Sequence, residues 1–149
     1  LANAVNTFKE LSEQHGHQGK EVRCSYFLNV TESKAETEQT KERMLKYFRG
    51  LVPAFPSDPK TAPPHIRYFV DIVERLNNMK TEDLSEKSII VGDAEHCIRV
   101  LKEVEATGIK EVIVYFDFGG LSHRETMQAM ERFAKYVLPH FDDTLVTQA

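Results

Sequence analysis

Residues that could do chemistry follow two of the strands expected from the sequence. In α/β folds, ligands gather at the carboxyl ends of parallel strands. Six residues at two such ends form a candidate rim for a bound substrate or cofactor: Asn29, Asp117, Phe118, Gly119, Gly120 and His123. Two glycines before a helix could let backbone N–H groups approach an anion. Asp117 could orient a substrate or accept a proton, and His123 could act as an acid or base near neutral pH.

Each of these residues also has a purely structural interpretation. Gly119 and Gly120 could simply turn the chain, because their motif is shorter than a nucleotide-binding fingerprint. An acidic residue at a strand end, such as Asp117, is often a loop cap. His123 lies in the first turn of an expected helix and could be solvated there. The sequence leaves both interpretations open.

Other kinds of catalytic site find no support in the sequence. His15 and His17 flank a glycine without a carboxylate or cysteine at ligand spacing, so we expect no metal site. No serine or cysteine occupies a strand-to-helix elbow of the G-x-S-x-G type, which argues against a catalytic triad.

Composition narrows the class of protein. The 149 residues allow one domain, spanning 1–149, with a sizeable core. A net charge of −4 gives no electrostatic case for binding nucleic acid or an anionic membrane. The longest apolar run, 112–116, is too short to span a bilayer. Two isolated cysteines, Cys24 and Cys97, suit a reducing compartment, so we expect a cytoplasmic protein.

The first third of the sequence predicts a helix, a strand and a second helix. The first helix carries an apolar stripe closed by two glycines: Leu1, Ala4, Val5, Phe8, Leu11, Gly16 and Gly19. Because the sequence opens on Leu1 inside this pattern, we expect a fragment of a longer protein. Residues 22–30 alternate apolar and polar side chains, which predicts a strand. Ser33 and Glu36 have capping-box spacing, so a helix should begin there.

The middle of the sequence predicts an irregular segment. Residues 53–64 hold five of the six prolines, which excludes regular structure and indicates a loop or insertion. A short helix should follow, with its apolar face formed by Ile66, Phe69, Val70, Val73 and Leu76.

The last part of the sequence predicts a strand–helix–strand–helix unit. Residues 88–91 form a short apolar strand, Asp93 is a good N-cap and Gly108 a helix terminator. The run 111–116 is typical of a parallel strand covered on both faces. A final helix should bury a long apolar face: Met127, Met130, Phe133, Ala134, Val137 and Leu138. This alternation predicts an α/β fold with right-handed crossovers.

Residues 89–97, continued by Leu101, Gly108 and 111–114, have a distinctive order of elements. A short strand ends in Val-Gly, a capping residue and a Glu follow, and a helix then leads to a Gly and an apolar strand. This order resembles the last repeats of the luciferase-like flavin-dependent monooxygenases.

Both ends of the sequence extend this resemblance. The tail 116–123, with 130–134 and 137–141, is similar to a subgroup of that family that ends in a Phe-Gly-Gly-Leu loop and a Pro-His-Phe terminus. Residues 8–17 resemble the helix that precedes the family's sixth strand. The resemblance is weakest across the proline-rich segment.

The resemblance implies a specific fold and activity. The family folds as a (β/α)8 barrel about twice this length, so the chain would be its C-terminal part, with about three parallel strands and their helices. Such enzymes bind reduced FMN and activate O2 to oxidise a small organic substrate, often with a flavin reductase as partner. The rim residues would then border substrate or flavin. The family's flavin contacts lie mostly in earlier strands, so we expect this chain to be inactive and to bind FMN weakly or not at all.

Two further expectations complete the sequence analysis. An alternative function is a non-catalytic α/β module that binds an anionic ligand or a protein partner at its strand ends. In either case a three-stranded piece can cover only one face of the strand 111–116. Open strand edges and an open apolar face favour association, so we expect a homo-oligomer.

Overall fold

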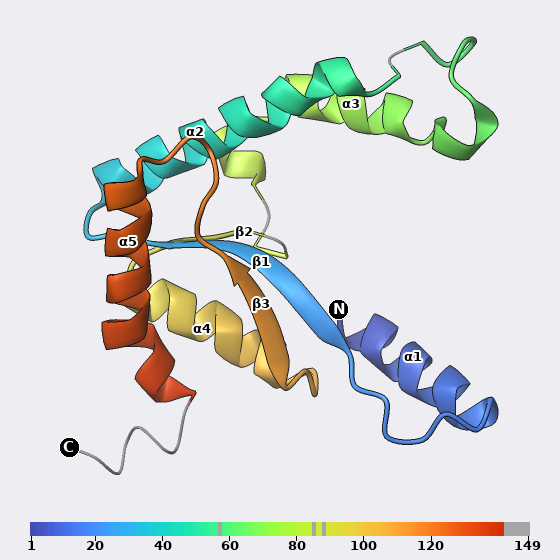
Figure 1. Ribbon diagram of the computed structural model, residues 1–149, viewed down its shortest axis with the longest axis horizontal. Coiled ribbons are helices and arrows are strands. Elements are labelled where there is room, and N and C mark those ends of the chain that lie inside the picture. The colour runs from blue at the N-terminus through green and yellow to red at the C-terminus, as the bar shows by residue number, and fades with distance from the viewer. Residues whose placement is uncertain (57, 85, 88, 142–149) are drawn as a thin grey trace.

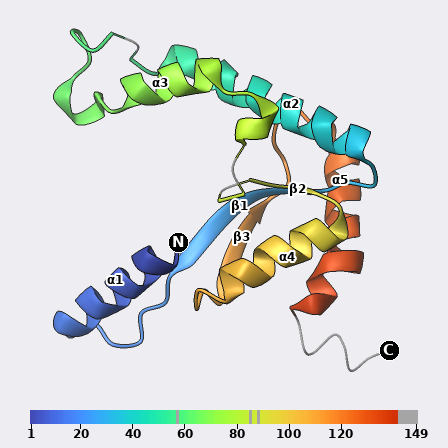
Figure 2. The ribbon, with the colours of Figure 1, turned by 180° about the vertical axis from the view of Figure 1, so that it is seen from behind.

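The computed structural model describes residues 1–56, 58–84, 86–87 and 89–141, arranged around a three-stranded parallel sheet. Helix α2 (Lys34–Leu51) lies on one side of the sheet and α4 (Ala94–Glu105) on the other (Figure 1). Helix α5 (His123–Arg132) runs across one end of the strands, from the level of α2 to that of α4 (Figures 1 and 2).

The N-terminal elements follow the predicted periodicities. Helix α1 (Ala2–Gln14) precedes strand β1 (Arg23–Val30). Between them Gly16 and Gly19 have positive φ angles of 75° and 71°, which a residue without a Cβ adopts readily. Of the apolar stripe on α1 only Val5 is buried. The helix therefore contacts the rest of the chain through its first half and projects away from it (Figure 2).

Helix α2 begins where the sequence predicts. The Glu36 backbone N–H donates to Ser33 Oγ at 3.2 Å, which caps the helix. The Glu36 carboxylate accepts from the backbone N–H of Glu32, at 2.8 Å, so the reciprocal bond lies one residue earlier than in a capping box. Because capping depends only on neighbouring residues, the spacing was sufficient to locate this helix start.

The proline-rich segment contains no element longer than a single turn among its described residues. Two short 3₁₀ turns, η1 (Val52–Ala54) and η2 (Pro64–Ile66), lie at its ends, before α3 (Phe69–Asn78). Helix α3 lies along the second half of α2, and together they form an arm that extends beyond the sheet (Figures 1 and 2). A further 3₁₀ turn, η3 (Thr81–Asp83), leads back to the sheet.

The predicted strand–helix–strand unit is present. Strand β2 (Ile89–Gly92), helix α4 and strand β3 (Glu111–Tyr115) follow one another. Asp93 caps α4, because its Oδ1 accepts the His96 backbone N–H at 2.8 Å. Gly108 has a φ of 86° between α4 and β3, as expected of a helix terminator. Ser88, the expected first residue of the strand, lies outside the described residues.

The strand order is β2-β1-β3, with both neighbour pairs parallel. An α/β fold with three parallel strands and flanking helices is therefore confirmed. In a (β/α)8 barrel, consecutive strands are neighbours and all helices lie outside. Here β1 separates β2 from β3, and helices cover both faces of the sheet, as in an open doubly wound sheet.

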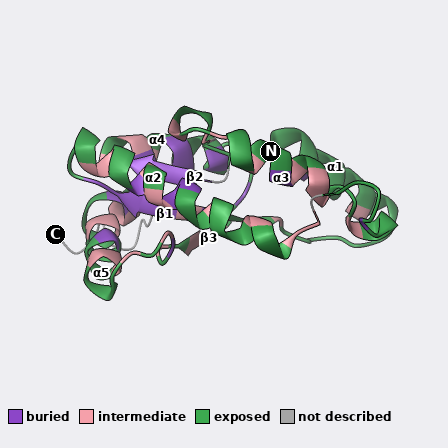
Figure 3. Ribbon diagram, turned by 90° about the horizontal axis from the view of Figure 1, so that it is seen from above, coloured by how far each residue is buried: buried purple, intermediate pink, exposed green. Residues whose placement is uncertain are grey.

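Two groups of apolar side chains form the core, one on each face of the sheet. The α4 face holds the larger group, which includes Tyr26, Leu28, Ile90, Cys97 and Val104. The smaller group lies under α2 and is made of four buried residues: Met44, Ile89, Val91 and Phe118. Buried positions concentrate on the sheet and its two covering helices, whereas α1 and α3 are mostly exposed (Figure 3).

Strand β3 leaves one face open. Its side chains facing the α2 side, Ile113 and Tyr115, are 46% and 49% exposed. Val112 and Val114 on the opposite face are only partly buried. The sequence analysis expected only one face of this strand to be covered, and this arrangement agrees with that expectation.

The C-terminal helix differs from the prediction in which side chains it buries. Ala129 and Val137 are buried and Phe133 packs against the core, but Met127 and Met130 are exposed. After α5, a π-helical turn, η4 (Phe133–Val137), and a 3₁₀ turn, η5 (Leu138–His140), change the helical period. The prediction of buried methionines was wrong because it assumed one regular period through this segment.

Candidate functional site at the carboxyl ends of the strands

Buried polar side chains gather at the carboxyl end of β1. The buried polar residues of the described chain are Asn29, Thr31 and Thr40, all at most 5% exposed. Thr31 Oγ1 and Thr37 Oγ1 are 2.6 Å apart and share a hydrogen bond. Asn29 follows Phe27 on the α2 face of β1 and is the register partner of Val91. The structure thus places Asn29, a predicted rim residue, inside the fold.

The loop after β3 packs against α2. Phe118 is 3% exposed and lies in the core group with Met44. Gly119 has a φ of 66°, and a Cβ there would lie 3.2–3.3 Å from the backbone of Arg43. Gly120 also has a positive φ, 71°, but faces open space. The close approach to Arg43 gives the first glycine a packing role, which matches the structural interpretation of the pair.

The first turn of α5 already holds a carboxylate. Glu125 accepts from the Ser122 backbone N–H and from Ser122 Oγ, both at 2.7 Å, and Ser122 Oγ accepts the Glu125 N–H in return. Arg43 NH1 lies 2.7 Å from Glu125 Oε1. The hydrogen bonds from Ser122, followed by that from Arg43, lower the pKa of Glu125 to about 2. An external anion would therefore compete with this side chain for the helix terminus.

Arg132 occupies the end of β1. Its NH1 donates to the Val30 carbonyl at 3.1 Å and to Glu36 Oε1 at 2.6 Å. Its NH2 donates to Glu32 Oε2 at 3.0 Å. The side chain is only 17% exposed, so these charge-assisted bonds are partly shielded from water. This guanidinium joins α5 to β1 and to the start of α2.

The predicted rim residues are only partly brought together. Asn29 and Phe118 are buried on the α2 face, whereas Gly120 and His123 are exposed beyond them. Arg132 and Glu125, which fill the same end of the sheet, were not predicted as site residues. Nothing in the sequence pointed to Arg132, because its partners lie 96 to 102 positions earlier in the chain.

The chemistry available to these residues is limited. No three metal-binding side chains come together among the described residues. Burial raises the pKa of the Cys97 thiol to about 12, with a smaller contribution from the Asp93 carboxylate. Burial also raises the pKa of Cys24. The Cys97 thiol is therefore held protonated and is a poor nucleophile.

The described residues at the carboxyl ends of the strands do not fit the phosphate of FMN. A flavin phosphate requires free N–H donors or unpaired cations. At this end of the sheet the α5 terminus is capped by Glu125, and Arg132 is shared between two carboxylates and a carbonyl. Among the described residues, this end of the sheet thus offers walls of a site but no phosphate cradle.

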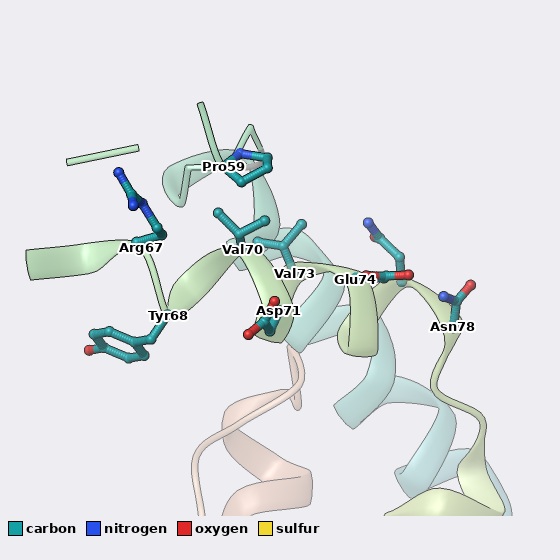
Figure 4. Close-up of a pocket in the computed structure, with 9 residues that line it drawn as sticks. Pro59, Arg67, Tyr68, Val70, Asp71, Val73, Glu74 and Asn78 are labelled. Carbon is teal, nitrogen blue, oxygen red and sulfur yellow. The ribbon is translucent and has the colours of Figure 1, made fainter. Parts of the chain in front are cut away.

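A hollow of about 300 Å³ lies at this edge beside Glu32 and Arg132, and two larger hollows lie away from it. A broad hollow of about 920 Å³ lies along α3, where Val70 and Val73 face Pro59 (Figure 4). A groove of about 540 Å³ runs beside β3 on the α4 face, lined mainly by apolar side chains such as Val112, Leu138 and Phe141. The proline-rich segment was the only sequence signal near the hollow along α3, and no signal indicated the groove.

Comparison with known proteins adds no assignment. Neither a protein-family model nor a curated protein sequence matches the chain significantly. Within the described part of the chain, no helix combines the length and apolar character needed to cross a bilayer.

Proposed function

We propose that this chain forms the C-terminal part of an FMN-dependent luciferase-like monooxygenase and is inactive alone. The sequence resemblance supplies the family. One structural observation supports it: the buried polar residue Asn29 and the open apolar side chains Ile113 and Tyr115 lie on the same face of the sheet. In a closed barrel this face would point inward, toward the carboxyl-end site, so α2, which packs on it in this chain, would have to move to the outside.

In this proposal the chain contributes surfaces rather than reactive groups. Reduced flavin would supply the oxygen chemistry. Asn29 and the loop 117–120 would border the small organic substrate. The whole enzyme would be cytoplasmic, oligomeric and dependent on O2 and a source of reduced FMN such as a flavin reductase. In this proposal the FMN phosphate would bind to the part of the enzyme outside this chain.

The proposal requires a change of strand partner. In a barrel β3 would pair with β2, and its position beside β1 would pass to a strand from elsewhere. Cys24 and Val112 are register partners across β1 and β3 in this chain. Val112→Cys should therefore cross-link readily to Cys24 under mild oxidation in the 149-residue chain. In the intact gene product of a barrel, the same pair should stay reduced.

Two measurements test the proposed function. The intact gene product should be a polypeptide of barrel size, about 250 residues or more, and should bind FMN. The 149-residue chain should leave FMN fluorescence unquenched at micromolar concentration. Micromolar binding by the chain, or an intact product of 17.1 kDa, would contradict the proposal and favour a small self-sufficient protein.

A second candidate function is a non-catalytic α/β module that binds an anion at its strand ends. The order β2-β1-β3, with helices on both faces, favours it, because open sheets bind ligands where the winding direction reverses. Inorganic phosphate should then shift the amide resonances of residues 31–33 and 118–123. Unchanged resonances at millimolar phosphate would exclude this function.

A further inference from the structure

We propose that two copies of this chain associate through β3, forming one continuous sheet with antiparallel β3 strands at its centre. The inference rests on the geometry of this edge and concerns the 149-residue chain, because in a closed barrel both edges of β3 would pair with strands of the same polypeptide. Strand β3 is an outer strand of the sheet, so one row of its backbone N–H and C=O groups is unpaired within the sheet. Such rows readily pair with another strand.

The β3 edge has few of the features that normally discourage pairing. Strand β3 contains no proline, and its one charged residue is Glu111 at its start. The opposite outer strand, β2, is only four residues long, and all four are buried. Of the two edges, β3 is therefore the one suited to accept a partner strand.

Apolar side chains flank this edge on both faces. On the α2 face, Ile113 and Tyr115 are about half exposed. On the α4 face, the groove of about 540 Å³ runs along Val112 and Val114. A strand added here would need apolar side chains on both of its faces. Strand β3 of a second copy meets this requirement, and a two-fold axis makes the contact reciprocal.

Charge selects one register for this pair. A two-fold axis perpendicular to the sheet keeps equivalent side chains on the same face. The Glu111 carboxylate already accepts a hydrogen bond from Arg23 Nε of β1 at 2.7 Å. Placing Ile113 opposite its own counterpart puts Glu111 opposite Tyr115, whose hydroxyl can donate to the remaining acceptor sites of this carboxylate. The next register in one direction places Glu111 opposite Asp117, a like-charge contact. The next in the other direction places Glu111 opposite the apolar Ile113.

Substitution at the two-fold axis tests the contact. The unmodified chain should sediment as a dimer at micromolar concentration. Ile113→Lys would place two ammonium groups opposite each other and should raise the dimer dissociation constant on the order of 100-fold. Leu11→Lys is the control, because Leu11 is equally exposed but lies on α1. A monomeric parent chain, or an Ile113→Lys variant that remains as dimeric as Leu11→Lys, would overturn the proposal.

Cross-linking tests the register. In a Cys24→Ala background, Ile113→Cys should form a disulfide-linked dimer on mild oxidation. Tyr115→Cys should not, because in the proposed register each Tyr115 lies opposite Glu111 and away from its own counterpart. Cross-linking of both variants to the same extent, or of Tyr115→Cys alone, would rule out this register.

Discussion

The two faces of the sheet differ in how completely they are covered. On the α4 face, Leu28 and Ile90 are fully buried, and α4 contributes four buried residues from its twelve. On the α2 face, α2 is longer, with eighteen residues, but buries only Thr40, Met44 and Leu45. Its second half leaves the sheet to pack with α3, so no helix of the described chain lies above β3 on this face (Figure 1).

Because of this difference, we expect one face of the sheet to supply most of the stability and the other to be available for binding. Helix α4 connects β2 to β3 across β1 and so covers most of its side, with a groove left beside β3. Helix α2 connects β1 to β2 and reaches no further across the sheet. The covered face should dominate the free energy of unfolding, whereas the open face and the carboxyl ends next to it are available for contact. Four predictions test this comparison.

The largest effect is expected on the covered face. Leu28→Ala should lower the free energy of unfolding by about 3 kcal/mol, because it leaves a cavity in the packed core. Ile113→Ala on the open face should cost less than about 1 kcal/mol, since half of the side chain already contacts water. Urea denaturation of both variants, at concentrations where the chain is monomeric, measures the difference. Equal losses would mean that the two faces contribute alike.

Arg132 should be the most important polar contact that joins α5 to β1 and α2. Arg132→Leu removes donors from Val30, Glu36 and Glu32 and leaves a carboxylate and a carbonyl poorly satisfied. We expect a loss of about 2 kcal/mol. Arg124→Leu on the exposed side of the same helix should change stability by less than about 0.5 kcal/mol. A loss no larger than that of Arg124→Leu would show that α5 is held by apolar packing alone.

Alanine substitution should destabilise the chain more at Gly119, which packs against Arg43, than at Gly120, which faces open space. Both residues have positive φ, so an alanine costs about 1 kcal/mol of backbone strain at either site. Gly119→Ala should cost about 1 kcal/mol more than Gly120→Ala, because its Cβ would press on the Arg43 backbone. Thermal unfolding of the two variants provides the comparison, and equal costs would remove the packing role of Gly119.

The smallest effect concerns Glu125 and pH. Its pKa in the folded chain is about 2, below the ordinary value of 4.5, so its contribution is complete above about pH 5 and is lost as the pH falls from 4.5 toward 2. Because 39% of its side chain is exposed, we expect at most about 1 kcal/mol. The stability difference between the parent chain and Glu125→Gln should therefore shrink on acidification from pH 6 to pH 3. A constant difference would contradict the assigned hydrogen bonds.

Much of the secondary structure could be predicted because its causes are local. The caps at Ser33, Asp93 and Ser122 act within three residues, and each was recognisable from spacing. The glycine turns and the alternation of β1 were recognisable for the same reason. Met127 and Met130 were predicted to share a buried face with Val137, but the π-helical turn after Arg132 shifts that face relative to α5. This turn packs against α4, a contact that no local pattern indicates.

The sequence was sufficient to predict the edge of the sheet at which the candidate site lies. It was not sufficient to predict which of the side chains there are buried or what they contact. Parallel strands direct their carboxyl ends to one edge, so Asn29 and the loop 117–120 were placed at that edge correctly. Whether each side chain is buried or exposed depends on which helix lies above it. Burial of Phe118 under α2 and the insertion of Arg132 beside Val30 follow from contacts between segments far apart in the chain.

The sequence by itself determined an α/β chain with three apolar strands and the approximate ends of its helices, since periodicity and capping are properties of short segments. Only the tertiary structure decided that β1 lies between β2 and β3. Backbone hydrogen bonds are equivalent at either edge of a strand, so they do not select the order. The order depends on how much apolar surface each arrangement of helices buries over the whole sheet. This total area cannot be predicted from the pattern of any short segment.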